Sequence, residues 1–335
     1  MYQVLQRPGD PLVYMTPDSV HWYCYDPTSQ PLGAGAMGTV YLGYDLETRQ
    51  RIAVKQVRNE YANNPEIRRR AINEASLVFT HPNIVKMLGV CTETPDRGPI
   101  FILSEFVDGQ TFDSYVHSRL DYYPPQERLV HLLDIAIPLL DALQILHDNG
   151  VIHRDIKPSN VMIQRDGTGK LMDLGIAKTG RDGQRHQTVG FIGTCQYAAP
   201  ELLVGNNQVS KADYRVDIYA FGIMLYELIT GRNPFDAETQ AEVMIKQVRN
   251  PLPATSVIPS KLLNILRRAT EKDCANRYQS ATQFKEALEV YLGRKNATQR
   301  NTSGTVSHKS MHIAFIVMGI VSVLWIIALV IVFNN

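Results

Sequence analysis

This chain of 335 residues has few cysteines and tryptophans and almost no net charge. It has four cysteines and two tryptophans, and its 34 Lys and Arg against 33 Asp and Glu leave a formal net charge of +1. The cysteines, which include no CxxC pair, predict neither a disulfide framework nor a zinc site. Nucleic-acid binding is not expected, because it requires a basic surface to offset phosphate charge.

No signal peptide is expected either, since the first ten residues contain no apolar core. Hydrophobic residues make up 44% of the chain and charged residues 20%. This composition does not favour disorder, and the length allows one large folded unit with a sizeable core.

One long apolar run is present near the end of the chain. Residues 313–333 carry no charge, and as a helix they would span about 31 Å. The hydrocarbon core of a bilayer is ~30 Å thick, so we expect a transmembrane helix. The alternative, a buried core helix, fits this uninterrupted run less well.

Charges beside this run predict its orientation. Residues 294–312 hold four cations and no acid, whereas only Asn334 and Asn335 follow the run. The positive-inside rule then keeps the preceding chain cytoplasmic and the C-terminus outside, in a single pass of the plasma (inner) membrane. Residues 294–312 are expected to form a flexible basic linker, whose cations can also contact anionic lipid heads.

The most informative segment lies mid-chain: His153-Arg154-Asp155-Ile156-Lys157-Pro158-Ser159-Asn160, followed by Asp173-Leu174-Gly175. A carboxylate at Asp155 can accept a hydroxyl proton, and Lys157 is spaced to face the same side and steady a phosphate. Asn160 and Asp173 offer the oxygen ligands that Mg²⁺ prefers. The pattern predicts phosphoryl transfer, in which a protein mainly aligns the nucleophile and neutralises phosphate charge.

These motifs resemble those of the protein kinase family, and further motifs follow in that family's order. Ile52-Ala53-Val54-Lys55 resembles the strand whose lysine grips the α- and β-phosphates of ATP. Upstream, eight residues match the glycine-rich loop, where missing side chains let backbone N–H groups approach phosphates: Gly33, Ala34, Gly35, Ala36, Met37, Gly38, Thr39 and Val40.

The resemblance implies ATP and Mg²⁺ as cofactors, with Mn²⁺ as the alternative metal. Asp155, Lys157, Lys55 and Glu74 are the implied catalytic residues, and Asn160 and Asp173 the metal ligands. Besides the glycine-rich loop, the implied nucleotide-binding residues are Leu32, Ala53, Lys55, Glu105, Val107 and Met162.

Glu74 is assigned because the family fixes its lysine with a glutamate from the following helix. Apolar residues at helical spacing between Pro65 and Phe79 predict that helix and leave Glu74 beside its apolar face.

Downstream, residues 193–201 resemble the peptide-docking segment that ends the activation loop, with Thr194 as the docking residue. The segment 217–222 resembles the buried helix of the larger lobe. Arg277 stands where the family pairs an arginine with the glutamate of its APE motif, here Glu201.

Lys157 and Thr194 resemble residues of serine/threonine-specific kinases, and the compact activation loop is most similar to bacterial eukaryotic-type (Hanks-type) kinases. Protein substrates with serine or threonine acceptors are therefore implied. Arg154 before Asp155 implies switching by activation-loop phosphorylation, with autophosphorylation expected at Thr188. Crowding in the bilayer plane would favour a transient kinase dimer for this reaction.

The implied fold is α+β and two-lobed, with a small β-rich lobe holding one main helix, a larger mainly helical lobe, and a C-terminal transmembrane helix. Helical periodicity from Gln126 onward agrees with the larger lobe. The expected parts are an irregular N-terminal arm (1–28), a kinase domain (29–293, with the hinge at 105–109), the linker (294–312) and the transmembrane helix (313–333).

Two other functions share parts of this pattern. Small-molecule kinases have similar chemistry but do not need the docking motif at 193–201 or Arg277. A pseudokinase would bind nucleotide as a membrane scaffold without transferring phosphate. The ordered presence of Lys55, Glu74, Asp155, Asn160 and Asp173 favours an enzyme.

Overall fold

The computed structural model describes residues 3–35, 38–65, 68–69, 72, 78–92, 98–173, 195–204 and 213–295. The chain divides into a compact unit, Met1–Tyr291, and a second unit, Leu292–Asn335. The run 313–333 and most of the basic linker lie outside the described residues, so their expected structure remains a prediction.

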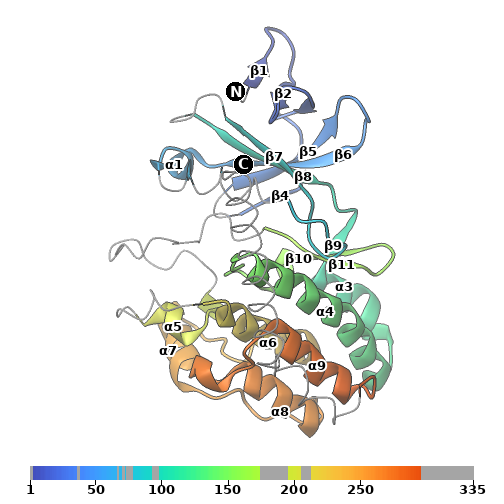
Figure 1. Ribbon diagram of the computed structural model, residues 1–335, viewed down its shortest axis with the longest axis vertical. Helices are drawn as coiled ribbons and strands as arrows, with labels where there is room; N and C mark the ends of the chain where they lie inside the picture. The colour runs from blue at the N-terminus through green and yellow to red at the C-terminus, as the bar shows by residue number, and fades with distance from the viewer. Residues whose placement is uncertain are drawn as a thin grey trace, which may run out of the picture. The chain divides into compact units, whose positions relative to one another are not determined.

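The first unit has a β-rich lobe and a helical lobe, as the resemblance implied (Figure 1). Within the described residues, the larger sheet has eight strands in the order β1-β2-β3-β5-β6-β8-β7, with β4 paired to β5. They are β1 (Gln3–Gln6), β2 (Val13–Thr16), β3 (Tyr23–Tyr25), β4 (Gly33–Ala34), β5 (Gly38–Asp45), β6 (Arg51–Val57), β7 (Met87–Thr92) and β8 (Ile100–Glu105).

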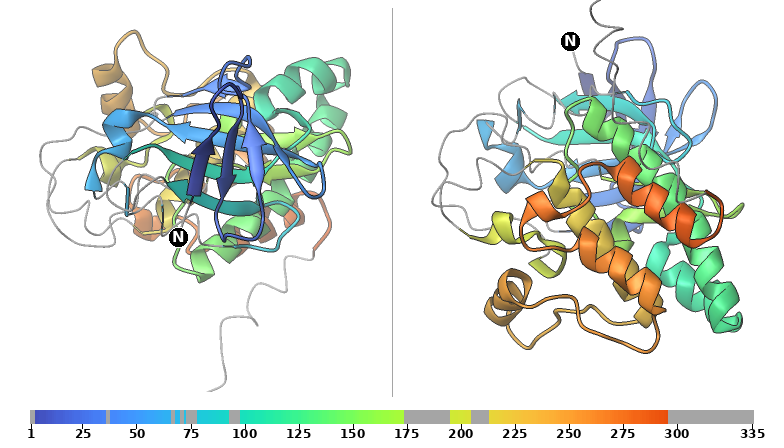
Figure 2. Two further views of the ribbon diagram at one scale, coloured as in Figure 1. Left: turned by 90° about the horizontal axis from the view of Figure 1, so that it is seen from above. Right: turned by 60° about the horizontal axis from the view of Figure 1, so that its bottom comes forward.

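The N-terminal arm forms short strands, whereas the sequence predicts an irregular segment. Residues 3–16 form a hairpin whose second strand pairs with β3, and β3 pairs with β5. The hairpin packs on this sheet, because Val13 and Met15 lie in one core with Tyr25, Ile52 and other sheet residues. Seen from above in Figure 2, the dark blue hairpin lies over the sheet. Each fully buried apolar side chain contributes roughly 1.5–3 kcal/mol, and this burial holds the short strands on the sheet.

The helical lobe is built around two long helices, α4 (Pro125–Asp148) and α6 (Arg215–Thr230). Proline at the first position starts α4, and α6 ends at Gly231, whose φ of 76° suits glycine. Where the structure describes the first unit, its other α-helices are α1 (Asn59–Ala62), α3 (Phe112–Arg119), α5 (Pro200–Leu203), α7 (Gln240–Arg249), α8 (Ser260–Ala269) and α9 (Ala281–Tyr291). The second view in Figure 2 shows α8 and α9 beside α4 and α6.

A small sheet in the order β11-β10-β9 lies between the hinge and the helices, formed by β9 (Gly109–Thr111), β10 (Val161–Gln164) and β11 (Gly169–Leu171). It carries the segments that flank the candidate site. By length and composition alone, one helix of the described chain, α4, could cross a membrane, but half of its apolar stretch is buried inside the protein. Its apolar face instead forms the core of the helical lobe.

Candidate active site

The loop before β10 is anchored by one buried carboxylate. Asp217 of α6 is 1% exposed and accepts hydrogen bonds from the backbone N–H groups of His153 (2.8 Å) and Arg154 (2.7 Å). It also contacts the His147 ring at 2.9 Å. Burial raises the pKa of Asp217, but His147 and the backbone donors outweigh burial and hold it below its ordinary value. The anchored carboxylate holds the Arg154 backbone at a φ of 58°. This strained conformation turns the chain toward Asp155.

Asp155 is held on two sides by its own loop. Its Oδ2 atom accepts a hydrogen bond of 2.8 Å from the Asn160 amide and lies 3.1 Å from the Lys157 ammonium. Asn160 is 8% exposed, and its amide also binds the Asp155 backbone carbonyl. The spacing expected from sequence therefore brings these three side chains together, with a carboxylate and a cation on the same side.

Lys55 and Asp173 form the second half of the site. Lys55 on β6 donates to Asp173 Oδ1 at 2.6 Å, although 118 residues separate them. Burial raises the pKa of Asp173, but the Lys55 ammonium outweighs it and holds the pKa below the ordinary value. Asp173 has a φ of 48° and directly follows Met172, whose N–H and C=O bind Asn160 and His153. Backbone contacts thus join the two halves.

The hinge at Glu105 is tied to both sheets. Glu105 Oε1 accepts from the Lys86 backbone N–H at 2.8 Å and from Lys170 Nζ at 2.7 Å. Val107 is buried. Ser104 lies on the central strand β8, between Ala53 on β6 and Met87 on β7. Met162 lies on β10, opposite Lys170 of β11.

The glycine-rich loop is closed by backbone pairing. The N–H of Leu32 donates to the Val40 carbonyl, and the N–H of Gly35 donates to the Gly38 carbonyl. A Cβ at Gly38 would collide with the backbone of Gln56, so this position requires glycine. Gly33, Ala34 and Gly35 are exposed, which leaves their backbone open to a ligand.

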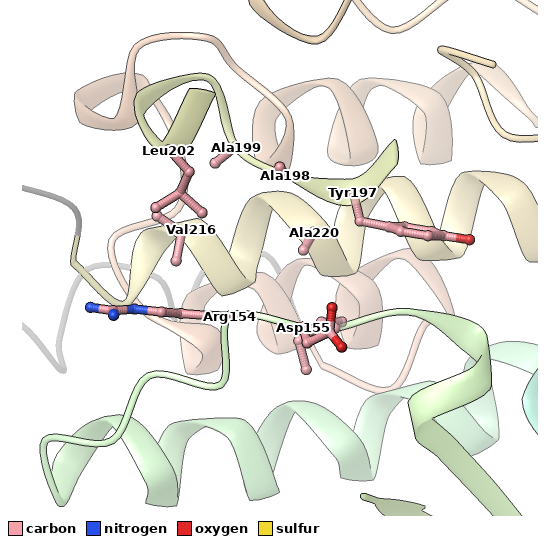
Figure 3. A pocket seen from close by; sticks show the side chains of 9 residues that line it. Arg154, Asp155, Tyr197, Ala198, Ala199, Leu202, Val216 and Ala220 are labelled. Carbon is pink, nitrogen blue, oxygen red and sulfur yellow. The ribbon is translucent and has the colours of Figure 1, made fainter. Parts of the chain in front are cut away.

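The pairing expected between Arg277 and Glu201 is confirmed. Arg277 donates to both carboxylate oxygens, at 2.7 and 2.8 Å, and its side chain is fully buried. This pair fixes α5. The segment just before α5 lines a small pocket that faces Asp155. The pocket is lined by Arg154, Asp155, Ile156, Tyr197, Ala198, Ala199, Leu202, Val216 and Ala220. In Figure 3 the Arg154 guanidinium points away from the Asp155 carboxylate.

Several residues assigned from sequence lie outside the described residues: Ala36, Met37, Glu74, Thr188 and Thr194. Other contacts were missed. The Lys170–Glu105 pair had no local signal, because the partners are far apart in sequence. The anchoring role of Asp217 was also missed, although an acid directly before the apolar run that follows it in α6 was a signal of a buried anchor.

Comparison with known proteins defines the class first. The family model for the protein kinase domain matches residues 27–290. The chain therefore belongs to the protein kinase domain family, as its two lobes and site geometry indicate. The hairpin of residues 3–16 precedes the matched region.

Bacterial serine/threonine kinases are among its similar proteins. The chain is 37% identical over 272 residues to the probable serine/threonine-protein kinase SCO3848 of Streptomyces coelicolor, covering 78% of this chain and 39% of that protein. It is 34% identical over 268 residues to the serine/threonine-protein kinase PknB of Mycobacterium tuberculosis, covering 77% and 41%. It is 32% identical over 287 residues to the probable serine/threonine-protein kinase CPE1738 of Clostridium perfringens, covering 84% of this chain and 39% of that protein. The chain thus spans about two fifths of the length of these curated relatives.

Proposed function

We propose that this protein is a membrane-anchored serine/threonine protein kinase that transfers the γ-phosphate of ATP to hydroxyl groups of proteins. The observation that carries the proposal is the position of Asp155, whose carboxylate is held by Asn160 at 2.8 Å and by Lys157 at 3.1 Å. A carboxylate oriented in this way can accept the proton of an attacking hydroxyl, and the adjacent cation can stabilise the charge on the transferred phosphoryl group.

The oxygen donors fit a hard divalent cation. Asp173 uses Oδ1 for Lys55, and Asn160 uses its amide nitrogen for Asp155. Their remaining oxygens are donors of the kind that Mg²⁺ prefers, and Mn²⁺ suits the same set. The metal, when bound with ATP, would neutralise phosphate charge. Glu74 is assigned to orient Lys55 on the strength of the family resemblance.

Substrate binding is assigned to the segment after Thr194. Three small side chains, Ala198, Ala199 and Ala220, line the small pocket that faces Asp155, and the docking segment thus lies beside the proposed base. Serine and threonine are the proposed acceptors because Lys157 stands two residues after Asp155, as in serine/threonine-specific relatives.

Regulation and location complete the proposal. Thr188 is the proposed autophosphorylation site, reached in a transient dimer of kinases in the membrane plane. Residues 313–333 are the proposed membrane anchor, with the kinase domain cytoplasmic. Extraction of membranes at alkaline pH should leave the full chain in the pellet; release into the supernatant would contradict the anchor.

Phosphate transfer by the full chain, purified in a non-ionic detergent, tests the function. Labelled ATP and a generic serine-containing protein should give transfer by the wild type, and Asp155→Asn should lower the rate by at least about a hundredfold. Asp166→Asn, in the exposed turn between β10 and β11, is the matched control and should transfer at the wild-type rate.

The possible outcomes are distinct. Equal transfer by Asp155→Asn and wild type would remove the role of Asp155 as the base. Nucleotide binding without transfer by the wild type would instead indicate a pseudokinase scaffold. Unchanged thermal unfolding of Asp155→Asn would show that the loss of rate is not a loss of fold.

A further inference from the structure

A lysine remote from Asp155 lies in an aromatic environment. Lys272, on the connection between α8 and α9, places its ammonium 4.3 Å from the Phe235 ring centroid and 5.1 Å from that of Tyr219. It also donates a hydrogen bond of 2.8 Å to the Tyr219 hydroxyl. Aromatic faces attract cations, so this geometry suits a protonated amine.

A chain of hydrogen bonds leads from this lysine to the substrate-docking segment. Tyr219 is fully buried, and its hydroxyl donates to Gln247 Oε1 of α7 at 2.5 Å. Gln247 is also fully buried, and its side-chain amide donates to the backbone carbonyl of Gln196. Asn233 donates to the same carbonyl at 3.3 Å.

The direction of each bond depends on the charge at Lys272. An ammonium group can only donate, so the Tyr219 hydroxyl must accept from it and direct its single proton to Gln247. The Gln247 amide oxygen is thereby turned to Tyr219, and its NH₂ group to Gln196. Without a donor at position 272, the Tyr219 oxygen loses the partner that holds it, and the hydroxyl can turn from Gln247 Oε1 to the Gln247 backbone carbonyl, 3.4 Å away.

Gln196 is directly followed by Tyr197, Ala198 and Ala199, which line the pocket opposite Asp155 (Figure 3). We propose that Lys272 is a positioning residue for the protein substrate, acting through Tyr219 and Gln247 on the backbone of Gln196. This inference rests on the proposed protein kinase function and assigns a specific residue to the docking of its substrate.

The charge of Lys272 also makes the arrangement sensitive to pH. Burial, followed by the nearby Arg277 charge, lowers the pKa of Lys272 to about 7, while Glu271 opposes this shift. Tyr219 on α6 accepts its hydrogen bond, and burial raises the pKa of Tyr219 well above its ordinary value; Arg277 opposes this shift and Glu201 on α5 adds to it. Lys272 is therefore the group of this cluster that loses its charge as pH rises through about 7.

Steady-state kinetics on the full chain in detergent test the proposal. At pH 6.5, Lys272→Met should raise KM for a serine-containing peptide by about tenfold, the value of one hydrogen bond made by a charged group. Its kcat should stay within about twofold of wild type, and KM for ATP should not change. Lys272→Arg, which keeps a charged donor, should restore KM. Tyr219→Phe should match Lys272→Met, and the double variant should be no worse than either.

Lys285→Met is the matched control. Lys285 is also a partly buried lysine of the helical lobe, paired with Asp141 at 2.6 Å and Glu289 at 3.7 Å, and within the described part of the chain neither of these contacts leads to Gln196. Its loss should reduce stability without changing peptide KM. In wild type, peptide KM should rise between pH 6.5 and 8, and Lys272→Arg should reduce this dependence.

An unchanged peptide KM in Lys272→Met, an equal rise in Lys285→Met, or no restoration by Lys272→Arg would overturn the proposal. Amide hydrogen exchange of residues 195–199 provides a readout that does not require catalysis. It should be faster in Lys272→Met than in wild type or Lys285→Met, and equal exchange would also overturn the proposal. A wild type that transfers no phosphate would refute the kinase function, while exchange would still decide whether Lys272 positions this segment.

Discussion

Replacing Arg277 by leucine should be among the most destabilising single changes in the helical lobe. Its guanidinium donates to both oxygens of Glu201 and to the backbone carbonyls of Glu271 (2.7 Å), Lys272 (3.1 Å) and Arg215 (3.2 Å). The Arg277 side chain is 0% exposed and that of Glu201 is 14% exposed, so water cannot readily replace these bonds.

The expected loss follows from leaving one charge of a buried pair without its partner. Removing one member of such a pair costs about 3–5 kcal/mol, because the remaining charge stays desolvated. For a domain of this size, that loss lowers the melting temperature by on the order of 10 °C. Glu201→Leu should cost a comparable amount. The double variant should lose less than the sum of the two, because neither charge is then left alone.

Urea unfolding followed by circular dichroism on the full chain measures these losses. Arg165→Ala is the control, since Arg165 pairs with Asp108 at 3.3 Å but its side chain is 83% exposed. It should cost less than about 1 kcal/mol. An Arg277→Leu protein within about 1 kcal/mol of wild type, or additive losses in the double variant, would refute the reasoning.

Three further predictions concern the site itself. Asp217→Asn should lose about 3 kcal/mol at pH 7. The pKa of Asp217 is lowered in the folded state, so its charged carboxylate stabilises the fold fully above about pH 4, and this stabilisation is lost as pH falls further. Urea midpoints should therefore fall less with acid in Asp217→Asn than in wild type, and parallel curves would contradict this. Ser104 is a small residue directly before the hinge, where the resemblance implies a larger one, so we expect a pocket behind the adenine. Ser104→Phe should therefore weaken binding of ATP analogues enlarged on the adenine, and equal affinity would refute this pocket. Thr188→Ala should lower activity and remove the main phosphopeptide, whereas undiminished activity would count against Thr188.

Much of the site could be predicted because its chemistry demands particular residue types at short spacing. Asp155, Lys157 and Asn160 lie within one loop, so local sequence brings them together, and the structure places them in contact. The helical periodicity after Gln126 likewise matches α4 (Pro125–Asp148), since an amphipathic helix shows its period within its own residues.

The N-terminal arm could not be predicted in the same way. Its strands have only three or four residues, too few to show an alternating pattern. They form because β5 offers an unpaired edge and the sheet offers an apolar face, and neither is visible in residues 1–28.

Which chemical groups are available, and that they occur in the order of a protein kinase, can be read from the amino-acid sequence alone, because motifs are local. The fold is needed to know which distant groups meet: Lys55 with Asp173, Glu105 with Lys170, and Lys272 with Tyr219. The physical reason is that burial removes these groups from water, and a buried charge without a partner is costly. The fold alone specifies which partner lies beside each charge.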